Sequence, residues 1–161
     1  MILRPLTHAD LGTLHELYAD SAAMRYAGGP TQSLDESEER LQRFLDHQAR
    51  HGFGFWAVTL RENAAVIGDG GLIHLAFRGP EVEVGYRLKS PYWGKGFATE
   101  VARAVVAYGF DTLGLDRIVA VTHPENVASQ RVLEKAGLRF VGMSVYKGKR
   151  VRKYAIERVS R

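Results

Sequence analysis

Two glycines, Gly94 and Gly96, join a strand-like segment to a helix-like segment in the middle of the chain. An alternating pattern occupies residues 82–88, a helical pattern runs over 96–113, and another strand-like run follows at 117–122. A strand, a helix and a second strand in this order form a crossover connection, which makes the two strands parallel. The chain therefore requires a sheet with a parallel pair and a helix packed against it.

The other strand-like runs are separated by short polar turns or helical patterns, and they predict mainly antiparallel pairing. These runs occupy residues 2–6, 55–60, 66–75, 138–146 and 151–159. Further helical patterns occupy residues 8–20, 34–51 and 126–137. We expect an α/β (α+β) fold, with a mixed, mostly antiparallel, twisted sheet of about seven strands and helices on both faces.

Length and composition favour one globular domain over residues 1–161. The 161 residues are 45% hydrophobic and 25% charged, with no cysteine and a net charge of +4. Without cysteine, disulfides, thiolate metal sites and cysteinyl acyl-enzymes are excluded. No apolar run could span a membrane and the start does not resemble a signal peptide, so we expect a cytoplasmic protein that binds neither membranes nor nucleic acid. The densest basic stretch, 147–153, is interpreted as the solvated edge of a hairpin.

The glycine loop has the chemistry of an anion site. Without Cβ atoms at Gly94 and Gly96, backbone N–H groups can approach a diphosphate, and the positive end of the following helix adds to the attraction. A turn in which glycine only relieves strain is the alternative. Lys95 lies between the glycines, so the ending of a Walker A loop is missing, and Thr99 stands where the dinucleotide fingerprint needs a small residue.

Three segments together resemble one family. They are Glu81-Val82-Glu83-Val84-Gly85-Tyr86-Arg87-Leu88, Tyr92-Trp93-Gly94-Lys95-Gly96-Phe97-Ala98-Thr99-Glu100 and Asn126-Val127-Ala128-Ser129. They resemble the GCN5-related N-acetyltransferases (GNAT), and within them the branch of ribosomal-protein N-terminal acetyltransferases. The resemblance implies that the loop binds the pyrophosphate of acetyl-coenzyme A, with Trp93 where the family usually has Gln or Arg. The implied cofactor-binding residues are Tyr86, Arg87, Leu88, Trp93, Gly94, Lys95, Gly96, Phe97, Ala98, Thr99, Asn126 and Ser129.

Glu83 is the candidate general base. In a strand it shares a face with Gly85 and Arg87, and a solvated residue or a partner of Arg87 is the alternative interpretation. The resemblance implies that the glutamate of a Glu-x-Gly-Tyr pattern polarises or deprotonates the acceptor amine. An N-terminal α-amine, with a pKa of roughly 8, needs a weaker base than a lysine amine near roughly 10.4, so the chemistry favours an amine of low pKa.

Asn126 and Ser129 form a second candidate group at the start of the last helix. Asn126 is expected to cap that helix. Many relatives have a tyrosine in the following turn that protonates the departing thiolate, but Leu133 occupies that position. Ser129 lies one turn earlier on the same face, and the resemblance implies that it hydrogen-bonds to or protonates the sulfur.

The predicted reaction is direct transfer of an acetyl group to a primary amine, either a peptide N-terminal α-amine or a small-molecule amine. Strand N–H groups near Tyr86 and Arg87 are expected to polarise the thioester carbonyl. Because the tyrosine is missing, a non-catalytic acyl-coenzyme A binding or sensor module is the alternative. In the family, segments corresponding to 22–30 and 146–150 shape the acceptor cleft. The acceptor's identity and the choice between monomer and homodimer stay open.

Three histidines are candidates for a metal site or a core role. His47 and His51 are four residues apart on the helix at 34–51, a spacing that can chelate a metal. The residues between them lack the glutamate of the His-Glu-x-x-His motif and no third ligand is evident, so we expect an exposed helix face and no metal. His74 lies in an apolar run and is interpreted as a core or rim histidine.

Overall fold

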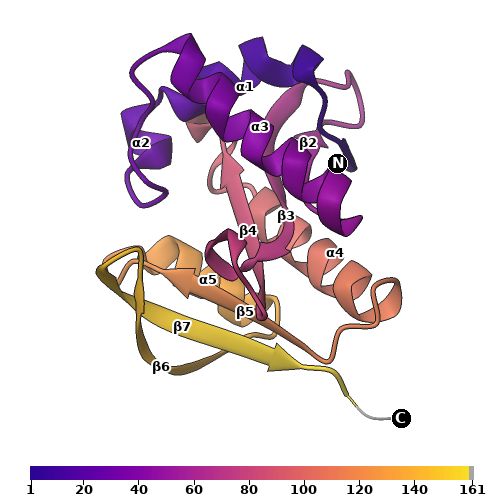
Figure 1. Ribbon diagram of the computed structural model, residues 1–161, viewed down its shortest axis with the longest axis vertical. Coiled ribbons are helices and arrows are strands. Elements are labelled where there is room, and N and C mark those ends of the chain that lie inside the picture. Colours follow the sequence, from indigo (N-terminus) through magenta and orange to yellow (C-terminus); the bar gives the residue numbers. More distant parts are fainter. Residues whose placement is uncertain (160–161) are drawn as a thin grey trace.

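A seven-stranded sheet forms the centre of the computed structural model, which describes residues 1–159; residues 160 and 161 of the expected domain lie outside the described part. The strands are β1 (Ile2–Pro5), β2 (Phe55–Thr59), β3 (Val66–His74), β4 (Val82–Leu88), β5 (Arg117–Thr122), β6 (Arg139–Tyr146) and β7 (Lys149–Glu157). Their order is β1-β2-β3-β4-β5-β7-β6 (Figure 1). Among the described strands only β4 and β5 are parallel, so the expected mixed, mostly antiparallel sheet is confirmed.

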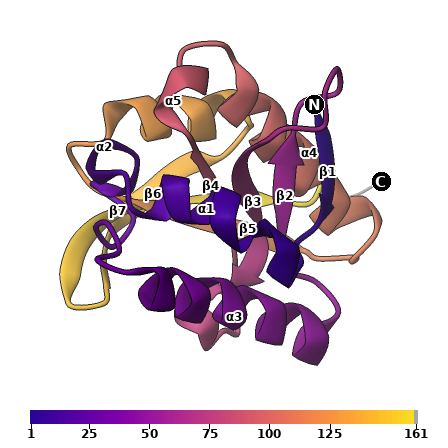
Figure 2. The ribbon, with the colours of Figure 1, turned by 90° about the horizontal axis from the view of Figure 1, so that it is seen from above.

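Helices cover both faces of this sheet. The α-helices are α1 (Leu11–Tyr18), α2 (Ser21–Met24), α3 (Leu34–His51), α4 (Phe97–Asp111) and α5 (Val127–Lys135). Three short 3-10 helices are η1 (His8–Asp10), η2 (Leu75–Phe77) and η3 (Ser90–Tyr92). Figure 2 shows α3 on one face of the sheet and α4 with α5 on the opposite face, as expected.

The helical periodicity of the sequence creates the two core layers. On the face covered by α4, Val101 and Val105 are fully buried. A Cβ on Gly70 would lie 2.9 Å from the Val101 side chain, so glycine in β3 allows α4 to approach the sheet closely. On the other face, Phe44 of α3 stacks on Phe55 of β2, with ring centroids 4.5 Å apart.

The first helical segment differs from its prediction. We expected one helix over 8–20, but α1 ends at Tyr18 and a separate α2 begins after Asp20. The Asp20 carboxylate accepts hydrogen bonds from the N–H groups of Ala22 (2.9 Å) and Ala23 (3.3 Å). An aspartate that caps a new helix ends the previous one, because its side chain competes for the backbone.

The parallel pair at the centre diverges almost at once. β4 and β5 are paired only at Glu83 and Val119, although β4 continues to Leu88. β5 pairs along its whole length with β7 on its other side. Among residues 1–159, the edge of β4 that faces β5 therefore has no strand partner beyond the Glu83–Val119 pair.

Within residues 1–159 no helix is both long enough and apolar enough to cross a membrane.

Candidate active site

The loop between β4 and α4 presents an uncapped helix N-terminus. Gly94 (φ +72°) and Gly96 (φ +83°) adopt the left-handed conformation that glycine tolerates best. Gly96 is the N-cap of α4 and has no side chain to accept a hydrogen bond, and the first helical bond runs from the Glu100 N–H to its carbonyl (3.1 Å). Three N–H groups consequently have no acceptor among residues 1–159, which leaves them available to an anion. They belong to Phe97, Ala98 and Thr99.

The surface of this loop is open. A Cβ on Gly94 or Gly96 would meet no atom within 4 Å, so the space before both residues is free. Trp93 anchors the loop, because its Nε1 donates to the Leu88 carbonyl at 2.8 Å. Lys95 lies exposed on the loop with its ammonium 5.9 Å from the centre of the Tyr92 ring.

A cavity of about 420 Å³ adjoins the loop and includes two cations that the sequence analysis missed, Arg103 and Lys135. Arg103 donates through Nε (3.2 Å) and Nη2 (3.1 Å) to the Lys135 carbonyl, which connects α4 to the end of α5. The sequence contained one signal for Arg103: it follows the loop residue Thr99 by one helical turn, so both residues lie on the same face of α4. These cations add to the positive potential of the helix end.

The register between β3 and β4 decides which backbone groups of β4 face the gap. The Lys89 N–H donates to the Ile67 carbonyl at 2.8 Å, and the two strands continue in that register. In an antiparallel ladder, every second residue directs both its N–H and its C=O at the same neighbouring strand. Lys89 directs these groups at β3, and so does Arg87, two residues earlier. The residues that face the gap beside β5 are Val84, Tyr86 and Leu88. This geometry agrees with a donor at Tyr86 and corrects the expectation of a backbone donor at Arg87.

The Arg87 side chain is also committed elsewhere. Its Nε and Nη2 donate to the buried carboxylate of Asp69 at 3.0 and 2.7 Å. The guanidinium lies over the rings of Tyr18 (4.9 Å) and Phe44 (5.1 Å). Arg87 therefore pairs with Asp69 and not with Glu83, which removes one alternative interpretation of that glutamate.

Glu83 lies buried where β4 and β5 separate. It is 8% exposed, and its carboxylate forms no ion pair with any residue of the described chain. Burial raises the pKa of Glu83 to about 7, while the positive charge of Lys147 opposes that rise. A carboxyl group with such a pKa is divided between its acid and base forms at neutral pH, as a general base requires. The interpretation of Glu83 as a solvated residue is wrong.

The turn after β6 provides the neighbours of Glu83. Burial and the negative charge of Glu83 raise the pKa of Tyr146 to about 12, so its hydroxyl is protonated at neutral pH. Lys147 follows directly and lies exposed at the turn. The site thus contains side chains from the 146–150 segment, one of the two segments that the family resemblance associates with acceptor binding.

Ser129 is joined to β4 across the gap. Its Oγ lies 3.0 Å from the Tyr86 hydroxyl, which is also 3.2 Å from the Ser129 carbonyl. The Asn126 side chain accepts from the Ser129 N–H (3.2 Å), which confirms the predicted cap. Leu133 is 2% exposed and packs in the core. Burial raises the pKa of Tyr86 to about 12, so its hydroxyl, which is hydrogen-bonded to Ser129, is protonated at neutral pH.

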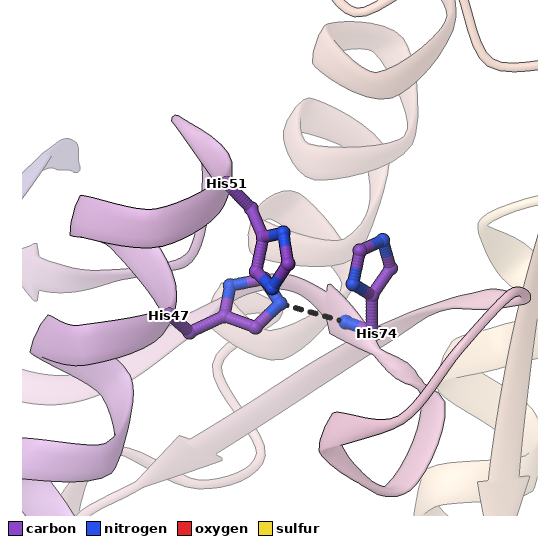
Figure 3. Close-up of side chains that lie close together, drawn as sticks. All are labelled: His47, His51 and His74. Carbon is purple, nitrogen blue, oxygen red and sulfur yellow. Dashed lines mark hydrogen bonds between the residues drawn. The ribbon is translucent and has the colours of Figure 1, made fainter.

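Three histidines gather at the end of α3 and of β3 (Figure 3). Ring nitrogens of His47, His51 and His74 lie within 4.8 Å of one another, so the expectation that no third residue joins the pair is wrong. His47 is also buried, unlike the exposed residue expected. Its Nδ1 lies 2.8 Å from the Phe53 carbonyl and its Nε2 accepts from the His74 backbone N–H at 3.0 Å. His47 therefore bridges α3 to β3 with both nitrogens.

Comparison with known families identifies the chain. The model of the acetyltransferase (GNAT) domain matches residues 1–139. The chain is a GNAT acetyltransferase. The acetyltransferase is 34% identical over 145 residues to the uncharacterized N-acetyltransferase YoaA of Bacillus subtilis, an alignment that covers 89% of this chain and 81% of YoaA.

Solved structures agree with this assignment. An acetyltransferase from Agrobacterium tumefaciens has a TM-score of 0.84 and 28% identity, covering 97% of this acetyltransferase and 90% of that chain. The spermidine N-acetyltransferase of Vibrio cholerae, solved with coenzyme A and spermine, has a TM-score of 0.79 and 24% identity, with 97% and 94% covered. This second likeness concerns the fold. Family membership makes this chain an enzyme, an acetyl-coenzyme A dependent N-acetyltransferase, and decides against a non-catalytic module.

Proposed function

We propose that this single domain of residues 1–161 transfers the acetyl group directly to a primary α-amine in the gap between β4 and β5. One observation carries the proposal. The unpaired edge of β4 runs from the uncapped N-terminus of α4 to the buried carboxyl of Glu83. A cofactor held by its phosphates at the first point can extend its thioester along backbone donors to the second.

The proposed cofactor site uses three parts of the chain. The loop at Gly94 and Gly96 binds the pyrophosphate through backbone N–H groups, and Arg103 and Lys135 supply positive charge for a further phosphate. The Tyr86 N–H donates to the thioester carbonyl, where negative charge develops during attack. Coenzyme A in the Vibrio cholerae protein, which has the same fold, supports this choice of cosubstrate.

The proposed chemistry proceeds without an acetyl-enzyme. The neutral amine attacks the thioester carbon, the C–N bond forms as the C–S bond breaks, and Glu83 takes the proton that the nitrogen loses. Ser129 donates a hydrogen bond or proton to the leaving sulfur, and Tyr86 positions Ser129 from across the gap. A base with a pKa of about 7 matches an α-amine better than a lysine amine, because less of the amine is protonated. The resemblance to ribosomal-protein N-terminal acetyltransferases implies the same class of amine.

The test is a reaction of the protein with acetyl-coenzyme A and a library of primary amines. Thiol release measures turnover, and mass spectrometry identifies the acetylated product. We expect an acetylated α-amine, no acetyl group on the protein, and a far slower reaction with Glu83→Gln. Acetylation of lysine side chains alone, or full activity of Glu83→Gln, would contradict the proposal.

A further inference from the structure

Positive side chains surround the approach to Glu83 from the α3 side. A cavity of about 350 Å³ lies between α3, η2 and the turn after β6, and its lining includes Arg43, Arg50 and Lys147. Lys147 also acts on Glu83, since its charge opposes the rise in the pKa of that carboxyl. Ala76 and Phe77 of η2 line the cavity, and η2 is held to the start of β4, because the Leu75 N–H donates to the Glu81 carbonyl (2.8 Å) two residues before Glu83. The cavity therefore lies near the end of β4 that carries the candidate base.

These cations have no acidic partner in the described part of the chain. None of Arg43, Arg50 and Lys147 forms an ion pair within residues 1–159, whereas Arg87 nearby is neutralised by Asp69 at 2.7 Å. Among the described residues, Asp46 is the one carboxylate that lines the cavity, and it accepts a hydrogen bond from Gln42 (2.8 Å). The lining therefore has an excess of positive charge.

Neighbouring cations increase the excess of positive charge in the cavity. The pKa of Lys147 is lowered by the partial burial of its side chain and then by the positive charges of Arg43 and Arg40, with Glu83 opposing. Within residues 1–159, Arg40 makes one hydrogen bond, to the Gly29 carbonyl (3.3 Å), and lies over the Tyr18 ring at 5.6 Å. Cations that repel one another in this way gain most from a ligand that brings negative charge.

We propose that the acceptor is a small amine that carries its own carboxylate or phosphate group, bound by Arg43 and Lys147 while its amine faces Glu83. This inference rests on the proposed function and names the substrate class of the same site. A volume of about 350 Å³ suits a small molecule. Polyamines such as the spermine bound to the Vibrio cholerae relative carry only positive charge, and this lining repels them.

The experiment compares matched acceptors that differ in one charge. An α-amino acid is paired with its carboxamide, and O-phosphoserine amide with serine amide, so that every member of the pairs is an α-amine; spermidine serves as a cationic acceptor. We expect kcat/KM to be at least roughly tenfold higher for the anionic member of one pair, as for a lost hydrogen bond to a charged group. Preference within the first pair identifies carboxylate as the ligand, and preference within the second identifies phosphate. Equal or better turnover of the neutral members or of spermidine would overturn the inference.

Two variants connect the preference to the cavity. Arg43→Gln and Lys147→Gln should each reduce the preference for the anionic acceptor roughly tenfold and leave acetyl-coenzyme A affinity unchanged, whereas Arg43→Lys should retain part of it. Lys149→Gln is the matched control, because Lys149 is an exposed cation two residues beyond Lys147 and does not line the cavity. If neither charge variant changes the preference for the anionic acceptor, this inference is overturned and the proposed function stands. If no amine of any class is acetylated while acetyl-coenzyme A binds, the proposed function fails, and the inference with it.

Discussion

Replacing Glu83 by glutamine should make the stability of the variant, relative to that of the wild type, increase with pH, while it abolishes most activity. The pKa of Glu83 is raised from 4.5 to about 7 by burial, so the folded state binds this proton more tightly than the unfolded state. Stability from this group is present below pH 4.5 and is lost as pH rises to about 7. At about 1.4 kcal/mol per pH unit, the ionised carboxylate costs the fold about 3 kcal/mol above pH 7. The glutamine variant does not titrate and avoids this cost.

Urea unfolding of both proteins from pH 4.5 to 8.5 measures the effect. The stability of Glu83→Gln minus that of the wild type should increase by about 3 kcal/mol across this range, because other titrating groups cancel in the difference. A buried amide without a partner lowers the stability of the variant by about 1–3 kcal/mol at every pH, so it does not change how the stability difference depends on pH. Glu81→Gln is the control, since Glu81 pairs with Lys153 at 2.6 Å and its loss should give no gain at high pH. A difference that does not change with pH would refute the electrostatic account of Glu83.

Three further predictions concern the loop, the leaving group and the histidines. Gly96→Ala should cost about 1–2 kcal/mol of stability, because of the positive φ at this position, and should weaken acetyl-coenzyme A binding as measured by calorimetry. Gly114→Ala is the control: Gly114, with φ +68°, follows the other end of α4, so its replacement should cost stability only. Ser129→Ala should slow acetyl transfer roughly tenfold to a hundredfold, and a thioester with a more acidic thiol should recover part of that loss; full activity would reduce Ser129 to a structural residue. The pKa of His47 is lowered from 6.5 mainly by burial, so stability should fall as pH drops below 6.5. In thermal unfolding, His47→Gln should reduce this loss of stability at low pH, and His51→Gln, at an exposed position, should reduce it less. Equal pH dependence in the wild type and both variants would contradict the bridging role of His47.

Much of the fold follows from local pattern. The alternation at 82–88 and the helical spacing of Val101 and Val105 place each residue on one face of its element. A glycine loop between such elements then leaves only a parallel crossover. The division of the first helix at Asp20 was missed, because a capping aspartate resembles any polar helix residue in sequence.

The site was less accessible to sequence because its chemistry depends on contacts between distant segments. Glu83 was identified by its strand, but its raised pKa comes from burial where two strands diverge, which no linear pattern encodes. The commitment of Arg87 to Asp69 depends on the β3–β4 register. His74 joins His47 only because β3 ends beside α3. Arg103 was recognisable by its spacing from the loop, but its partner Lys135 lies on another helix.

The most direct test of the central claim is the pH dependence of kcat/KM for acetyl transfer, measured in the wild type and in Glu83→Gln with an amine that both proteins accept. The account predicts an acid limb near pH 7 in the wild type, from the carboxyl whose pKa is about 7. Glu83→Gln should lose that limb, bind acetyl-coenzyme A as tightly as before, and approach wild-type rates only as the amine deprotonates itself at high pH. Identical profiles in the two proteins would show that Glu83 is not the base and would contradict the mechanism.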